Sequence, residues 1–279
     1  MKSLPAFLEG PRRMLVVLGA FIRVGYLMSM SYPLSFASDQ LATLAPIVTY
    51  HFIARLIAVP STNVAGDYYT FVIIGFLTSR LLAGGLRGVG DELEDAVREG
   101  RFESLLIQPV PWRALPLGLA QWPVIWRWVN AITVALVSLA LGAHYRWGGL
   151  PKAVVVVLLG STATMAIGNL AAGVKLLAKR TDPILTFYGI AVLIFAGVAY
   201  PIQLLPHYVR IFSYAIPETY VISALRKLLM PAGHTLPGPS ATSVIVGLLI
   251  FNIVVFPLSL WLFGRTLEYG RKTGLLGGY

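Results

Sequence analysis

Hydrophobic residues occupy six long runs along the chain, and polar residues collect between them. A helix rises about 1.5 Å per residue, so about 20 apolar residues cross a bilayer while satisfying their own backbone hydrogen bonds. The pattern predicts an all-α membrane protein with six transmembrane helices in a single domain over residues 1–279. The predicted spans are Leu41–Val59, Tyr68–Leu86, Leu117–Ala143, Ala153–Leu177, Ile184–Tyr200 and Ala241–Phe263.

The apolar stretch Met14–Met30 is not counted among these spans. Arg23 interrupts it, and Pro33 follows closely. An amphipathic helix in the cytoplasmic interface is therefore expected within residues 1–36, and a seventh span is the alternative.

A second apolar stretch, residues 201–230, is divided by Pro201, Pro206 and Pro217. The resulting pieces of about ten and thirteen residues are too short to cross a bilayer. The pattern predicts two short re-entrant helices that dip into the outer leaflet and return. A surface loop with two interfacial helices is the alternative.

Composition supports a membrane location. The chain is 57% hydrophobic and 12% charged, against about 25% charged residues in a soluble domain. A net charge of +10 would suggest nucleic acid for a soluble protein, but the basic residues here flank apolar runs. We therefore expect contact with membrane lipids and no nucleic-acid partner.

The distribution of Lys and Arg predicts orientation. If both termini are cytoplasmic, 16 of the 22 basic residues lie on the inner side. This agrees with the excess of positive charge on cytoplasmic loops. The prediction is a multi-pass protein of a cell membrane, such as a bacterial inner membrane, with both ends inside.

Half of the acidic residues, six of twelve, lie between Asp91 and Glu103. Asp91 can cap the start of a helix whose first turn carries Glu92 and Glu94. Acidic side chains are stabilising there, because the N-terminal end of a helix dipole is positive. We expect a cytoplasmic helix over residues 90–107 that docks a soluble partner. An ordinary solvated loop is the alternative.

This loop continues as EGRFESLLIQPV, from Glu99 to Val110. It resembles the loop after the second span of type-2 ABC (ATP-binding cassette) permeases, approximately E-G-T-[LF]-E-x-L-L-x-x-P, with Arg101 in place of Thr. Residues Tyr200–Leu229 are similar to that family's P-x-x-x-L-P…P-x-[TS]-Y…A-[LI]-R segment. The sequence SYPLSF, from Ser31 to Phe36, resembles its entry into the first span.

The resemblance implies a permease that pairs with a second copy of itself, or with a related permease, on two copies of an ATPase subunit. ATP and Mg²⁺ would bind that partner, so no cofactor is expected in this chain. The chain contains no G-x-x-x-x-G-K-[ST] phosphate-binding loop. The ATPase-coupling residues that the resemblance implies are Asp91, Glu92, Glu94, Asp95, Glu99, Gly100, Phe102, Glu103, Leu105 and Leu106.

Polar residues in or beside the spans are candidates for a substrate path or gate. His51 and Arg55 are four residues apart and share a helix face; a polar group in lipid suggests function, although snorkelling or structural pairing is the alternative. Glu218 and Thr219 suggest an exit gate or the cap of a short helix. The full set is His51, Arg55, Tyr200, Pro217, Glu218, Thr219 and Tyr220.

Two further features of the spans suggest contacts. Arg80, Arg87 and Arg127 are placed near the cytoplasmic side, where we expect them to contact inner-leaflet phosphate. Small residues in the second span permit close helix packing; they are Gly75, Ser79, Gly84 and Gly88.

Taken together, the motifs and the topology predict an export permease for a hydrophobic or amphipathic substrate such as a drug, a lipid or a lipid-linked glycan. The ATPase activity is expected on the separate subunit, and no catalytic or metal-binding residue is assigned. A proton-driven secondary transporter is one alternative, but no predicted span contains Asp or Glu. A lipid-modifying membrane enzyme is the other, but the four histidines are scattered.

Overall fold

The computed structural model describes residues 11–57, 64–98, 100, 114–178, 182–231 and 238–272. These residues form helices and short connections, and no β-strand occurs among them. The all-α prediction is confirmed for this part of the chain.

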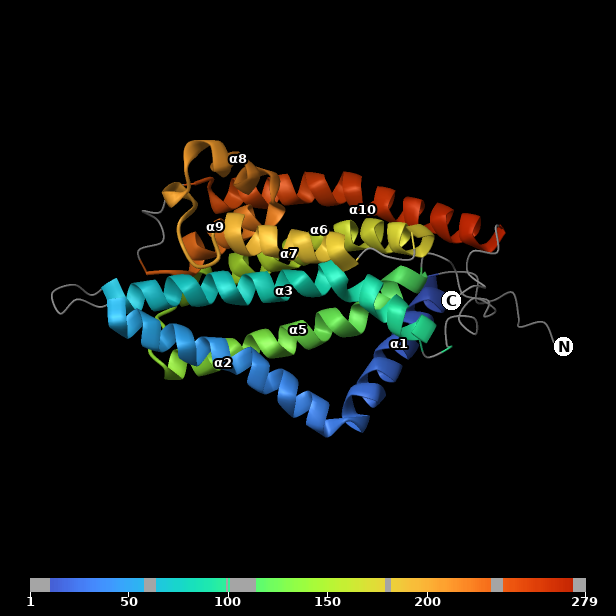
Figure 1. The fold of residues 1–279 in the computed structure, drawn as a ribbon, viewed down its shortest axis with the longest axis horizontal. Coiled ribbons are helices and arrows are strands. Elements are labelled where there is room, and N and C mark those ends of the chain that lie inside the picture. The colour runs from blue at the N-terminus through green and yellow to red at the C-terminus, as the bar shows by residue number, and fades with distance from the viewer. Residues whose placement is uncertain are drawn as a thin grey trace.

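Four long helices form the body of the molecule and lie side by side along its longest axis (Figure 1). They are α3 (Val64–Arg98), α5 (Ala114–Ala140), α6 (Leu150–Ala178) and α10 (Ala241–Lys272). Helix α3 packs against both α5 and α6, and α6 packs against α10. The core lies where these helices meet, with Val72, Leu82 and Val156 completely buried.

Helices α1 (Pro11–Ser31) and α2 (Pro33–Ile57) form a V that is joined at Tyr32 (Figure 1). Helix α1 runs obliquely to the long helices and packs against α5. There, Trp122 Nε1 donates a hydrogen bond of 2.7 Å to Ser29 Oγ. Helix α2 packs against α3 and α5.

Five of the described helices are long and apolar enough to cross a membrane. The qualifying segments are Met14–Ser31, Tyr68–Glu92, Leu117–Ala140, Trp147–Lys175 and Ala241–Tyr269. Four of them coincide with predicted spans. The first, in α1, meets the same criterion, so the interfacial helix and the seventh span both stay predictions.

The count of six spans is not confirmed. Helix α2, at the first predicted span, is 25 residues long but contains Asp39, Gln40 and Arg55 and is not among the qualifying segments. Helix α7 (Asp182–Phe195), at the fifth, has only 14 residues. At about 1.5 Å per residue, a helix of that length is shorter than the hydrocarbon core.

The predicted boundary between the second span and a separate cytoplasmic helix is wrong. Helix α3 runs unbroken from Val64 to Arg98, so Asp91 lies inside a helix and does not cap the start of a new one. Gly88 and Gly90 lie inside this helix and do not end it, and both are buried. The acidic residues 91–95 are thus the last turns of the same rigid element.

Glycines allow the long helices to pack with their backbones in contact. A Cβ atom at Gly168 of α6 would lie 2.4 Å from the carbonyl oxygen of Leu86 in α3. A Cβ at Gly85 would lie 2.7 Å from the carbonyl oxygen of Ser161. Of the small residues predicted to pack closely, Gly75 and Gly84 do so within this chain. A Cβ atom at Gly75 would lie 2.2 Å from the carbonyl oxygen of Val198, and one at Gly84 would lie 2.5 Å from Cγ of Arg127.

The proline-divided segment forms the two short helices that the sequence predicts, α8 (His207–Ala215) and α9 (Pro217–Leu229). Pro206 precedes α8, and Pro217 occupies the first turn of α9, where its missing N–H costs nothing. Short 3-10 turns, η2 (Trp147–Gly149) and η3 (Ile202–Leu204), complete this region. Helix α9 packs against α6 and α3; whether the pair dips into a bilayer stays a prediction.

Candidate functional site

A cavity lies beside α9, opposite the end of the molecule where α3 and α10 terminate (Figure 1). It has a volume of about 430 Å³ and is lined mainly by apolar side chains from α3, η3, α8 and α9. Polar groups enter it from Tyr214, Thr219, Tyr220, Ser223 and Arg226. A mostly apolar wall with a few converging polar groups suits an amphipathic small molecule.

A second cavity of about 400 Å³ adjoins the first along α8, α9 and α10. The two cavities share Tyr214, Tyr220 and Pro239. The hydroxyl of Tyr220 donates a hydrogen bond of 2.9 Å to the carbonyl oxygen of Tyr214. This hydrogen bond ties α9 to the end of α8, and the two tyrosines form part of the wall between the cavities.

Arg226 anchors α9 to the rest of the protein. Only 5% of it is exposed, and its guanidinium group donates hydrogen bonds to three backbone carbonyl groups. The acceptors are Phe71 in α3 at 3.1 Å, Gly197 at 2.7 Å and Val198 at 2.6 Å. Its Cζ atom also lies 3.3 Å from the centre of the Phe71 ring. The fork of the guanidinium group thus joins three segments at the cavity wall.

Glu218 lies in the first turn of α9 and is buried. The hydroxyl of Tyr188 in α7 donates a hydrogen bond of 2.7 Å to Glu218 Oε2. Burial raises the pKa of the Glu218 carboxyl group, and this hydrogen bond offsets part of the effect. The contact ties the start of α9 to α7, much as Arg226 ties its end to the 197–198 segment.

The structure brings together only part of the predicted path. Thr219 and Tyr220 line the larger cavity, and Pro217 and Tyr220 line the smaller one. The other members lie elsewhere: His51 packs edge-on against Tyr69, Arg55 is exposed, and the Tyr200 hydroxyl donates to the carbonyl oxygen of Ile194. Their proposed role in a substrate path stays a prediction.

Sequence reasoning did not assign Tyr188, Tyr214 or Ser223 to this region. Each is an ordinary polar residue on an apolar helix, and the tertiary contacts that bring it to α9 leave no local pattern. Arg226 did carry a signal, because it belongs to the motif after the fifth predicted span.

The acidic end of α3 lies at the opposite end of the molecule (Figure 1). Glu94 forms an ion pair with Lys175 of α6, and the Lys175 side chain is 10% exposed. Asp91 and Asp95 are exposed, and Glu92 is half-buried. Gly100 has a φ of +68°, a left-handed conformation that favours glycine. The other predicted coupling residues, Glu99, Phe102, Glu103, Leu105 and Leu106, lie outside the described residues.

We predict that the Glu94–Lys175 pair stabilises the junction of α3 and α6. Glu94→Gln leaves a buried ammonium group without its carboxylate, which costs about 2 kcal/mol of unfolding free energy. Lys175→Met alone should cost a similar amount, while the double variant should cost less than the sum. Thermal unfolding in detergent measures this cycle; additive losses would show that the pair contributes no coupling energy.

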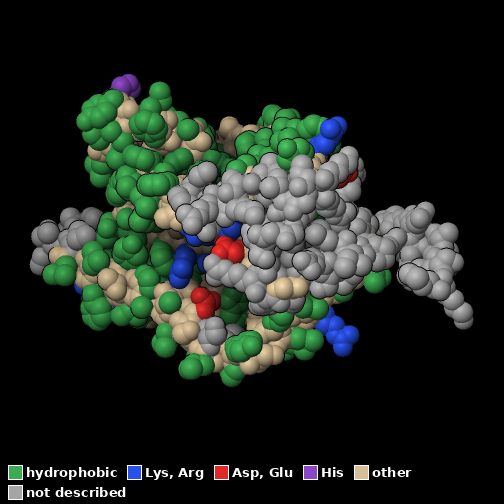
Figure 2. Space-filling view, turned by 45° about the vertical axis from the view of Figure 1, so that its right-hand side comes forward, with side chains coloured by type: hydrophobic (Ala, Val, Ile, Leu, Met, Phe, Trp, Pro, Cys, Tyr) green, Lys and Arg blue, Asp and Glu red, His purple; other side chains and the backbone are tan. Residues whose placement is uncertain are grey.

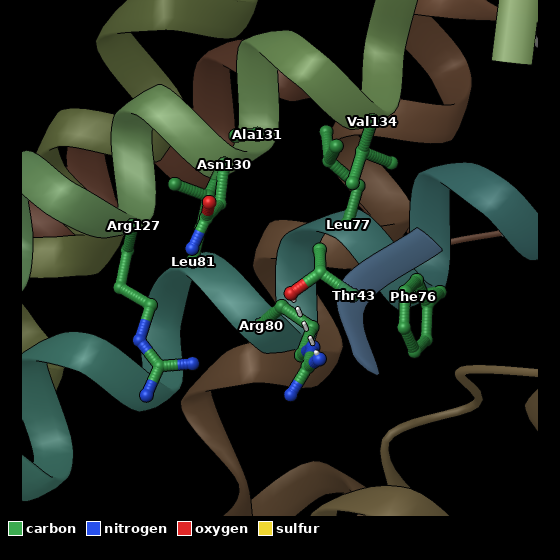
Figure 3. A pocket seen from close by; sticks show the side chains of 9 residues that line it. All are labelled: Thr43, Phe76, Leu77, Arg80, Leu81, Arg127, Asn130, Ala131 and Val134. Carbon is green, nitrogen blue, oxygen red and sulfur yellow. Dashed lines mark hydrogen bonds between the residues drawn. The ribbon is translucent and has the colours of Figure 1, made fainter. Parts of the chain in front are cut away.

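A polar cluster lies between α2, α3 and α5, near the middle of the long helices (Figure 3). Asp39 Oδ2 accepts hydrogen bonds from Trp126 Nε1 at 2.9 Å and from Asn130 Nδ2 at 3.3 Å. Gln40 Nε2 donates to Asn130 Oδ1. These contacts hold α2 against α5. The sequence pattern of each helix taken alone does not indicate that these residues meet.

Arg80 and Arg127 line the same pocket, and Figure 3 shows their guanidinium groups pointing to one side of it. Because α3 continues to Arg98, Arg80 lies at the middle of the apolar segment Tyr68–Glu92 and not near its cytoplasmic end. In the face that Figure 2 shows, basic and acidic side chains gather in a recess between two hydrophobic regions.

Residues 95–230 match the model of a protein family described as ABC-2 type transporter. This region is an ABC-2 type transporter domain. It begins at the acidic end of α3 and ends just after α9, so it contains both cavity-lining short helices. The predicted family is confirmed, and the chain is a multi-pass transporter permease.

The ABC-2 match has two consequences. Permeases of this kind form the membrane component of a transporter and normally work with an ATPase subunit. The matched region also spans the coupling and outer segments on which the resemblance rests. A search of curated proteins finds no match to the chain.

Proposed function

We propose that this permease is the membrane subunit of an exporter powered by ATP hydrolysis on a separate ATPase. The observation that carries the proposal is the continuity of α3. One helix joins the exposed carboxylates Asp91 and Asp95 to Phe71, whose carbonyl oxygen Arg226 binds at the cavity wall. A partner that moves the acidic end therefore acts directly on the wall of the cavity.

The proposed orientation places this acidic end in the cytoplasm of a bacterial cell, at the inner membrane. The first turn of α1, the last turn of α3 and the last turn of α10 lie at the same end of the molecule (Figure 1). That arrangement agrees with cytoplasmic termini and with the excess of basic residues on the inner side. The α9 cavities then face the outer half of the membrane, where an exported substrate leaves.

The proposed substrate is a hydrophobic or amphipathic molecule such as a drug, a lipid or a lipid-linked glycan. The largely apolar walls of both cavities support this class, and the tyrosine and serine hydroxyl groups would orient a polar part. In the proposed assembly, two copies of this chain pair on two ATPase subunits.

The experiment is co-purification of the permease with its ATPase. Two substitutions are combined at the proposed docking element. Asp95→Lys replaces a negative charge by a positive one, and Leu105→Asp introduces a charge that would lose its water when the ATPase binds. We expect recovery of the ATPase to fall about tenfold or more, as for loss of an interface hot spot. Glu94 is left intact, because it pairs with Lys175 inside the permease.

Glu268→Lys is the matched control, because Glu268 is another exposed acidic residue near the end of α10. It should leave ATPase recovery unchanged. Equal recovery with wild type, control and the Asp95→Lys, Leu105→Asp variant would overturn the proposed docking role of the acidic end.

A further inference from the structure

Three arginines lie together around one glycine of α3. Arg80 and Arg87 occupy the same face of the helix as Gly84, one turn before it and one turn after it. A Cβ atom at Gly84 would lie 2.5 Å from Cγ of Arg127, so the Arg127 side chain crosses α3 at this glycine. The missing side chain of Gly84 thus allows a third arginine to lie between the other two.

These arginines have few partners in the part of the chain that the structure describes. Arg80 Nη2 donates weakly to the carbonyl oxygen of Ala42 at 3.4 Å and to Thr43 Oγ1 at 3.3 Å. Arg87 Nη2 lies 3.4 Å from the carbonyl oxygen of Leu185. Within the described residues, the only ion pair with N···O within 4 Å is Glu94–Lys175, so none of the three is paired with a carboxylate there.

Nearby acidic residues reduce the positive charge but do not remove it. Asp39 and Asp91 both interact electrostatically with Arg127, and so do Arg80 and Arg87. The two aspartates therefore offset two of the three positive charges. Asp39 directs its Oδ2 atom toward the neutral donors of Trp126 and Asn130, so most guanidinium N–H donors keep no anionic acceptor among the described residues.

Guanidinium groups without an anionic acceptor are costly at this depth in a membrane helix. Arg80 lies at the middle of Tyr68–Glu92, and Arg127 lies near the middle of Leu117–Ala140. Arginine at the centre of a bilayer is expensive unless it meets an anion or a water-filled recess. Both side chains are only partly exposed, and both point to the same side of the pocket (Figure 3).

We propose that Arg80 and Arg127 bind one phosphate group, with Arg87 at the edge of the site adding positive charge. A guanidinium group offers a planar fork of donors that matches phosphate oxygens, which is why arginine recurs at such sites. The phosphate belongs either to the headgroup of an anionic lipid or to a free phosphate anion. This binding site does not depend on the direction of transport or on the ATPase partner.

The experiment measures what the full-length chain retains after purification in detergent. Native mass spectrometry counts bound phosphatidylglycerol, and a parallel titration measures the affinity for inorganic phosphate. Arg80→Gln combined with Arg127→Gln should weaken binding by about tenfold to a hundredfold, the loss expected for two charge-assisted contacts. Arg265→Gln is the control, because Arg265 is exposed on α10 and stacks on Trp261.

The two arms distinguish the source of the phosphate. Loss of phosphatidylglycerol in the double variant, but not in the control, assigns the site to a lipid headgroup. Loss of inorganic phosphate binding with unchanged lipid retention assigns it to a free anion. Equal binding of both probes by wild type and double variant would overturn the proposal.

A second variant keeps the question decidable if the double variant does not fold. Arg127→Lys retains the charge but loses the planar fork, and we expect it to bind the same probe several-fold more weakly. Unchanged binding by a folded Arg127→Lys protein, as judged by its elution and melting temperature, would count against a phosphate held by that fork.

Discussion

Arg226→Ala is expected to lower the unfolding free energy of the permease by about 3 kcal/mol or more, because it leaves buried acceptors without donors. Three backbone carbonyl groups lose their hydrogen bonds, and the Phe71 ring loses the cation above it. At a few degrees per kcal/mol, the apparent melting temperature should fall by roughly 5 to 10 °C. Unfolding followed by intrinsic fluorescence in detergent measures this shift.

Arg226→Lys separates charge from geometry at the same position. A lysine ammonium keeps the charge but lacks the fork that reaches three acceptors, so its melting temperature should lie between those of wild type and Arg226→Ala. Arg265→Ala removes an exposed arginine and should change little. If Arg226→Ala melted like Arg265→Ala, the role of Arg226 as the anchor of α9 would be refuted.

Gly168→Ala is expected to destabilise the permease by about 3 kcal/mol, because the new Cβ atom overlaps backbone atoms that have little room to move. It would lie 2.4 Å from the carbonyl oxygen of Leu86 and 2.6 Å from that of Gly85. Helices α3 and α6 would have to separate, which disturbs the core of the molecule. The melting temperature and the yield of monodisperse protein report the effect.

Gly247→Ala provides a matched control in another long helix. A Cβ atom at Gly247 of α10 meets nothing within 4 Å. Since alanine favours a helix over glycine by up to about 1 kcal/mol, this substitution should be neutral or stabilising. A Gly168→Ala protein as stable as Gly247→Ala would show that α3 and α6 can repack.

The helices themselves were predictable, but one important boundary was not. Apolar runs located α3, α5, α6 and α10, because lipid requires long uninterrupted apolar helices. The same rule ended the second span at Leu86, although α3 continues to Arg98. The part of a helix that projects beyond the lipid needs no hydrophobic residues. The change from apolar to polar residues therefore indicates where the helix leaves the membrane, not where the helix ends.

The candidate site was less predictable, because its contacts join residues far apart in the sequence. Arg226 was visible as a motif position, but its acceptor at Phe71 lies 155 residues away. Asp39 and Asn130 are separated by 91 residues and gave no local signal. The acidic residues before Glu103 were found from composition alone, yet the sequence did not indicate that Glu94 faces Lys175 inside the protein.

The unbroken length of α3 determines how far one of its ends moves when the other is tilted. Its 35 residues correspond to a rod of about 50 Å at the helical rise per residue. Gly84 and Gly85 would soften an isolated rod, but here Arg127 and α6 clamp them on two sides. A tilt of about 5° at the acidic end would therefore displace the far end by about 4 Å, roughly three-quarters of a helical turn. A small push at the acidic end would therefore become a larger movement at the end of α3 that carries the cavity-lining Phe71.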